Sequence, residues 1–135
     1  MAAKVEYSAT TRQISVTVSP TYLDDQAVPE HNHFAWAYHV VIKNRGNEIV
    51  QLRSRYWRIT NARGEVREVR GPGVVGEEPR LEPGEAFGYI SGVRLTTPSG
   101  IMTGSYQMET LHGESFDVEI PAFSLDSPHQ PVKLN

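Results

Sequence analysis

The chain has 135 residues, of which 39% are hydrophobic and 21% charged, with no cysteine and a formal net charge of -3. A chain of this length builds one hydrophobic core, and its apolar content is too high for a disordered protein. The lack of cysteine excludes disulfides, thiolate zinc sites and a cysteine nucleophile, and the negative charge gives no reason to expect nucleic acid as a partner.

Large apolar side chains alternate with small or polar ones along a series of short segments. In chain order, these segments are 14–18, 34–42, 50–61, 87–89, 102–108 and 116–120. A period of two indicates strands with one buried face, and glycine, proline and asparagine mark turns between them. About seven antiparallel strands with such regular turns predict an all-β sandwich.

The segment 50–61 changes its alternation part-way. Its apolar residues are first at even positions, Val50 and Leu52, and then at odd ones, Trp57 and Ile59. A regular strand cannot turn both sets toward one core, because successive side chains point to opposite faces. One extra residue reverses the facing, so we predict a β-bulge near Ser54–Arg55.

Residues 71–76 have the spacing G-x-G-x-x-G and follow a short strand-like stretch at 66–69. A dinucleotide-binding motif requires a helix next, but 77–84 contains two prolines and a turn, so that function is excluded. Two interpretations stay open. The backbone N–H groups form an anion-binding nest, from which Pro72 removes one donor, or the loop is a bend between two sheet edges.

Seven of the ten arginines lie between Arg45 and Arg70. This cluster leads into the glycine loop, where its guanidinium groups are suited to phosphate; the alternative is a solvated face paired with nearby glutamates. The candidate ligand-binding residues are Gly71, Gly73, Val74, Val75, Gly76, Arg55, Arg67 and Arg70.

No metal or catalytic site is predicted. His31 and His33 lack a second pair of ligands, and the chain has neither a G-x-S-x-G elbow nor an H-E-x-x-H motif. We therefore expect no enzyme activity and no cofactor. The first residues lack an apolar leader segment and no membrane-length apolar run occurs, so we expect a cytoplasmic protein without a membrane partner.

Tyr56 and Trp57 are candidates for contact with a protein partner. Adjacent strand residues face opposite ways, so one of the two aromatic rings should lie on the outer face of its sheet.

Several blocks in a fixed order give a resemblance to a known family. They are Arg55–Asn61, Gly71–Pro79, Leu81–Gly84, Tyr89–Gly92, Thr97–Met108 and Ile120–Phe123. In these blocks the chain resembles the ApaG family, also called CorD, from about residue 16 to 123. It departs at Pro72, where the family often carries glutamate. Because proline has no carboxylate, this departure argues against metal binding by the loop. The resemblance extends to one ApaG domain over 1–135, with 126–135 expected to be a loosely held tail.

The resemblance implies a fibronectin type III-like, immunoglobulin-like sandwich in a bacterial cytoplasm. It also implies an association with cobalt and magnesium tolerance, and a suggested nucleotide or pyrophosphate role. Similar domains in F-box and polymerase-interacting proteins imply protein–protein interaction. Our hypothesis is thus a non-catalytic binding module for an unidentified protein; the alternative is a phosphate, pyrophosphate or nucleotide binder at 71–76. An exposed strand edge is also compatible with a homodimer.

Overall fold

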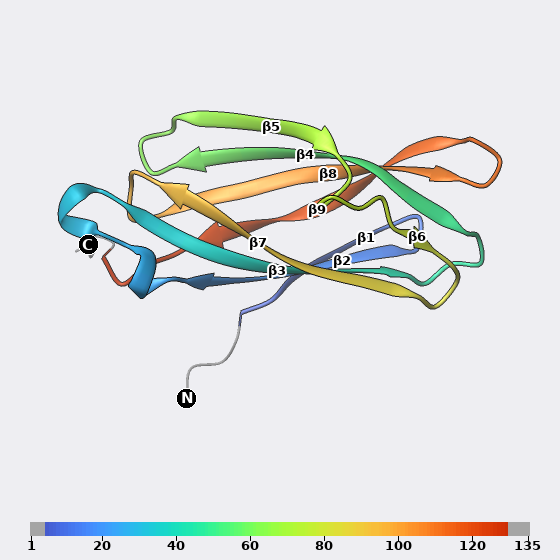
Figure 1. The fold of residues 1–135 in the computed structure, drawn as a ribbon, viewed down its shortest axis with the longest axis horizontal. Helices are drawn as coiled ribbons and strands as arrows, with labels where there is room; N and C mark the ends of the chain where they lie inside the picture. Colours follow the sequence, from blue (N-terminus) through green and yellow to red (C-terminus); the bar gives the residue numbers. More distant parts are fainter. Residues whose placement is uncertain (1–4, 130–135) are drawn as a thin grey trace, which may run out of the picture.

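The computed structural model describes residues 5–129, which form an elongated sandwich of two antiparallel β-sheets (Figure 1). The strands are β1 (Tyr7–Thr11), β2 (Ile14–Tyr22), β3 (Phe34–Asn44), β4 (Val50–Asn61), β5 (Val66–Pro72), β6 (Arg80–Leu81), β7 (Ala86–Leu95), β8 (Gly100–Thr110) and β9 (Ser115–Leu125). Two short 3-10 helices, η1 (Asp24–Gln26) and η2 (Pro29–His31), lie between β2 and β3. None of the helical segments in this range is long and apolar enough to cross a membrane.

The strand order confirms the fold class. One sheet has the order β1-β2-β3-β7, and the other has β5-β4-β8-β9 with β6 also paired to β4. Three strands, β2, β3 and β7, therefore face four, β5, β4, β8 and β9, as expected for a fibronectin type III-like sandwich. The expected seven strands are extended by β1, which forms a hairpin with β2, and by the two-residue β6.

The core lies between the sheets, where the inward residues of every long strand meet. Tyr38 on β3 packs its ring against Trp57 on β4 and Phe123 on β9, with centroid separations of 5.3 and 5.9 Å. Trp57 and Phe123 meet edge to face at 5.9 Å. Such aromatic pairs contribute about 0.5–1.5 kcal/mol each beyond the burial of their area, so they hold the two sheets together.

The bulge in β4 is confirmed, just before the expected place. The β4–β8 register shifts between Leu52 and Ser54, so Arg53 is the extra residue. Leu52 is 1% exposed and Trp57 3% exposed, which shows that both sets of apolar residues face the core. As a consequence Arg55 lies on the same face as Trp57 and points into the sandwich.

A second bulge, in β9, was not predicted. Met102 of β8 pairs with Phe123 and Gly104 pairs with Ile120, so β9 has one residue more than β8 between these pairs. Pro121 lies in this bulge, where a missing N–H group costs no ladder hydrogen bond. The bulge turns Phe123 toward the core together with Ile120, and both are at most 1% exposed.

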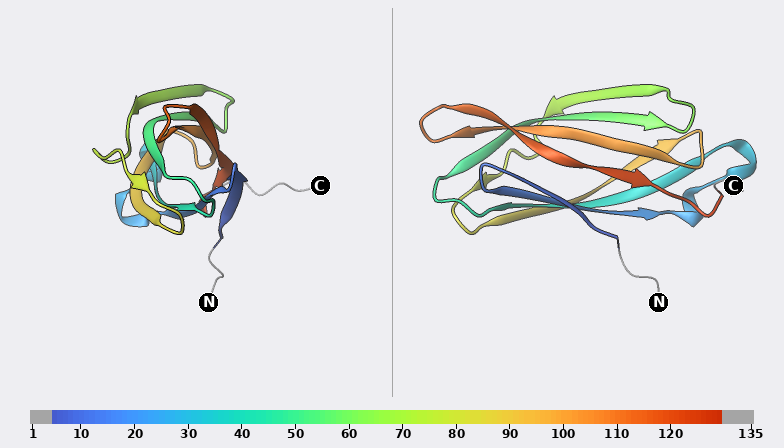
Figure 2. Two further views of the ribbon diagram at one scale, coloured as in Figure 1. Left: turned by 90° about the vertical axis from the view of Figure 1, so that its right-hand side faces the viewer. Right: turned by 180° about the vertical axis from the view of Figure 1, so that it is seen from behind.

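The two long sides of the sandwich differ. On one side β1 lies against β9, with the Tyr7 and Phe123 rings 6.2 Å apart and the Glu119 N–H donating to the Thr11 hydroxyl at 3.1 Å. On the other side β5 and β7 end their sheets, and no ladder joins them among residues 5–129 (Figure 2). This open side carries the candidate site.

The start of the expected tail contacts the sandwich. The Trp36 indole N–H donates to the Asp126 carbonyl at 2.8 Å, and the Ser127 hydroxyl donates to the Pro98 carbonyl at 2.6 Å. The rest of the tail, 130–135, lies outside the described residues.

Gly104 allows a close approach of β8 to β4. A Cβ atom there would lie 2.1 Å from the Tyr56 carbonyl oxygen, and the backbone is fixed by pairing on both sides. We expect Gly104→Ala to lower the free energy of unfolding by about 1–3 kcal/mol, as overpacking does. Urea unfolding measures this loss.

Gly88→Ala on β7 is the matched control, because the nearest atoms to its Cβ lie at 3.6 Å. It should leave stability unchanged or raise it slightly, since alanine restricts the unfolded chain. Equal destabilisation by the two substitutions would contradict the close approach at Gly104.

Candidate functional site

A cavity of about 530 Å³ opens on the side of the sandwich between β5 and β7. It is lined by Gln26, Tyr38, Arg55, Trp57, Ile59, Arg67, Val69, Val74, Val75, Tyr89, Ser91, Gly92, Val93, Arg94 and Met102. We call it the β5–β7 groove. Its volume is in the usual range of ligand sites, and its floor is made of core side chains such as Trp57, Ile59 and Met102.

The charge of the groove is positive. Arg55, Arg67 and Arg94 line it, and no aspartate or glutamate is among the lining residues. Arg94 donates to the backbone and side-chain oxygens of Gln26 at 3.5 and 3.4 Å, and Arg67 donates to the Arg94 carbonyl at 3.5 Å. These contacts are long, and within residues 5–129 none of the three arginines forms an ion pair with a carboxylate. The donors of Arg67 and Arg94 are therefore available to an anionic ligand.

Arg55 connects β4 to the glycine loop through hydrogen bonds. Its Nη1 donates to the carbonyl oxygens of Pro72 and Gly73, both at 2.9 Å. Its guanidinium group lies against Gly71, where a Cβ atom would come within 2.9 Å of Nη2. The side chain is half-buried, so these bonds hold it in place at the loop end of the groove.

Two N–H groups of the glycine loop, those of Gly73 and Val74, form hydrogen bonds within the chain. Val74 and Glu77 exchange backbone hydrogen bonds of 2.8 and 2.9 Å around Val75 and Gly76, whose φ angles are +43° and +81°. Two positive φ angles in a two-residue turn are typical of type I′. The Gly73 N–H donates to the Arg53 carbonyl at 2.9 Å. This geometry favours the bend over the anion-binding nest, although anion binding by the loop stays a prediction.

Three tyrosine hydroxyls lie beneath the groove. Those of Tyr89 and Tyr106 share a hydrogen bond in the core. Burial raises the pKa of Tyr38, Tyr89 and Tyr106, and the positive charge of Arg55 offsets only part of this effect. The three side chains are therefore neutral at physiological pH and act as hydrogen-bonding groups rather than nucleophiles.

The structure separates the candidate residues into two groups. Arg55, Arg67, Val74, Val75 and Trp57 meet in the groove. Gly71, Gly73 and Gly76 shape its loop end.

Arg70 does not lie in the groove but stacks over the Tyr56 ring, with its guanidinium carbon 4.3 Å from the ring centroid. The Tyr56 hydroxyl donates to Glu68 at 2.6 Å. Tyr56 follows Arg55 and precedes buried Trp57, so this second cluster is on the outer face of the sheet.

Sequence reasoning missed Arg94 and Gln26. Both lie far along the chain from the arginine cluster, in β7 and η1, and neither belongs to a motif. The pairing of β7 with β3 at the sheet edge brings Arg94 to the site, and Gln26 lies there as the acceptor of hydrogen bonds from Arg94.

Comparison with known proteins identifies the family. A model described as the ApaG domain matches residues 24–110, which include every lining residue of the groove. The chain belongs to the ApaG family. It is 63% identical to Protein ApaG of Parvibaculum lavamentivorans over 129 residues, covering 96% of this chain and 99% of that relative. Protein ApaG of Rhodospirillum centenum is 64% identical with the same coverage.

A solved structure of the same kind supports the fold. The crystal structure of the putative ApaA protein from Bordetella pertussis aligns with a TM-score of 0.84 at 43% identity, over 87% of this chain and 95% of that one. The resemblance to the ApaG family is thus confirmed by sequence and by structure.

The buried tyrosine pair makes stability depend on pH. Because the pKa of Tyr89 and of Tyr106 is raised in the folded protein, their contribution is complete below about pH 10, where unfolded tyrosines begin to ionise, and is lost as the pH rises further. We expect the double substitution Tyr89→Phe and Tyr106→Phe to reduce the loss of stability between about pH 9 and about pH 11.

Urea unfolding at both pH values measures this loss for the native chain and the variant. Both hydroxyls are removed together, because a single substitution would leave one buried hydroxyl without its partner. Equal losses in the two proteins would show that the pair does not control the alkaline limit.

Proposed function

We propose that this ApaG-family chain is a non-catalytic binding module that holds an extended segment of a protein partner in the β5–β7 groove. The observation that carries this proposal is the position of the groove between two strands that end their sheets. Strand edges present unpaired N–H and C=O groups, and an added peptide strand is a common way to satisfy them.

The lining of the groove suits a peptide. Gly92 on β7 is exposed, and a Cβ atom there would meet only the Trp36 carbonyl oxygen, at 3.6 Å. Packing within the chain therefore does not require a glycine, and the bare backbone lets another chain approach the edge closely. Val69 and Val93 flank the opening on β5 and β7 and provide apolar contact for side chains.

The same lining argues against catalysis in the groove. It contains no carboxylate or imidazole to serve as a general base, and its tyrosines are held neutral by burial. Among residues 5–129, moreover, no three histidine, aspartate or glutamate side chains are grouped to hold a metal ion.

A phosphate-containing small molecule is the second candidate. The convergence of Arg55, Arg67 and Arg94 in one cavity favours it. The loop 71–76 contributes less to it than its motif indicates, because Gly73, Val74 and Glu77 use their N–H groups within the chain. The association with cobalt and magnesium tolerance that the family resemblance implies belongs to this second candidate.

Photocrosslinking in cells tests the proposal. Val75 in the groove and Ile101 on the outer face of β8 are both 54% exposed, so they form a matched pair of positions for p-benzoylphenylalanine. We expect a discrete adduct with another protein from position 75 and none from position 101, because only the first faces the partner.

Three results would contradict the proposal: no adduct at either position, equal adducts at both, or an adduct from position 101 alone. An adduct with twice the mass of the chain would replace the partner by a second copy of this protein.

A further inference from the structure

The chemistry of the groove specifies its occupant further, on the assumption that the proposed function is correct. We propose that the bound segment is acidic: it places a carboxylate on Arg67, supported by Arg94, and an apolar side chain two residues away against Val69 and Trp57.

The first support is charge. Three arginines line one cavity without a carboxylate among its lining residues, in a chain whose formal net charge is -3. Three arginines outside the groove, in contrast, are paired with glutamates: Arg12 with Glu114 at 3.0 Å, Arg53 with Glu78 at 3.3 Å and Arg70 with Glu68 at 3.8 Å. A carboxylate in the groove would form charge-assisted hydrogen bonds with Arg67 and Arg94, whose donors have only long contacts now.

The second support is spacing along the strands. In the β4–β5 ladder, Arg67 pairs with Ile59, and Val69 pairs with Trp57. Gly71 pairs with Arg55 in the next step on the same face. The groove therefore presents a basic position, then an apolar one, then Arg55, in steps of two residues. An extended peptide has the same period, so alternate side chains of the peptide meet successive positions.

The third support is the length of this pattern. Arg55 and Ile59, the partner of Arg67, are four residues apart on β4, which is about 13 Å in a strand. Arg55 is moreover held by the Pro72 and Gly73 carbonyls. An elongated ligand with its acidic group at the Arg67 end fits both facts.

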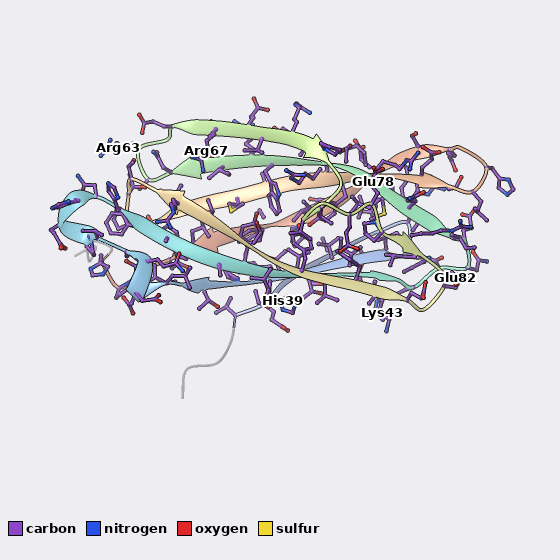
Figure 3. All side chains as sticks on the ribbon, in the orientation of Figure 1. His39, Lys43, Arg63, Arg67, Glu78 and Glu82 are labelled. Atoms are coloured by element: carbon purple, nitrogen blue, oxygen red, sulfur yellow. The ribbon has the colours of Figure 1, made fainter. Side chains whose placement is uncertain are left out.

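The charges at the two ends of this side give the segment a direction. Arg63 and Arg67 lie near one end, beside the β4–β5 turn, which carries the single acidic residue Glu65; Glu78 and Glu82, with Arg80 between them in the sequence, lie toward the other end (Figure 3). The acidic residue of the segment is attracted to the first end and repelled from the second.

Selection from a phage library of random peptides tests the inference. Peptides of about nine residues, about 30 Å when extended, cover the groove. On the native chain we expect enrichment of aspartate or glutamate two positions from an apolar residue. On the double variant Arg67→Glu and Arg94→Glu, that enrichment should disappear, and basic residues should replace the acidic ones.

Affinities of one selected, fluorescein-labelled peptide provide the quantitative test. Arg67→Glu should weaken binding about tenfold or more, the size of a lost charge-assisted hydrogen bond. Arg58→Glu makes the same change of charge at an exposed position of the outer face, between buried Trp57 and Ile59, and should have little effect. Affinity should also fall as salt rises from about 50 to about 200 mM.

Selected peptides without acidic enrichment, or equal effects of Arg67→Glu and Arg58→Glu, would overturn the acidic chemistry. Tighter binding of inorganic pyrophosphate than of the peptides would also overturn it, in favour of the phosphate ligand. A crosslink from position 75 that persists in Arg67→Glu would refute this inference while retaining the groove as the binding surface. No crosslink from position 75 in the native chain would refute the proposed function itself.

Discussion

The extra residue at Arg53 is the constraint on which the rest of the sandwich depends. Without it, either the first or the second half of β4 would turn its large side chains to solvent, because facing alternates strictly along a strand. With it, Leu52 and Trp57 both enter the core at 1% and 3% exposure. The same reversal turns Arg55 inward, where a charged residue needs partners.

Those partners come from the glycine loop, so the bulge and the loop act as one unit. Two backbone carbonyls satisfy Arg55, and Gly71 leaves room for its guanidinium group. The loop is thereby held over the end of the groove as the chain leaves β5. The buried hydroxyls of Tyr89 and Tyr106 lie beneath and add no negative charge at physiological pH. The groove thus combines an apolar floor with a positive rim.

Local patterns in the sequence predicted the features that repeat along a strand. The alternation from Phe34 to Ile42 predicted strand β3, and the change of parity in 50–61 predicted the bulge in β4. The same signal is present in β9, where Val118 and Ile120 are followed by Phe123, but this change of parity falls beyond the alternating segment 116–120.

The groove itself has no such local signal. It forms because β7 and β5 end different sheets on the same side, and this depends on the order in which distant strands pair. No local pattern therefore indicates Arg94. Proximity in the sequence places Arg70, only three residues from Arg67, among the candidate ligand-binding residues. The alternation of a strand instead sends Arg70 to the outer face with Tyr56.

The central claim is that the β5–β7 groove is the binding surface, and an amide NMR titration of isotopically labelled protein with a peptide selected on it tests this most directly. The largest saturable shifts should occur at Val69 on β5 and at Gly92 and Val93 on β7, because a bound strand would contact both edges. Shifts concentrated around Ile101 on the outer face, or confined to the loop tip at Gly76, would contradict the claim.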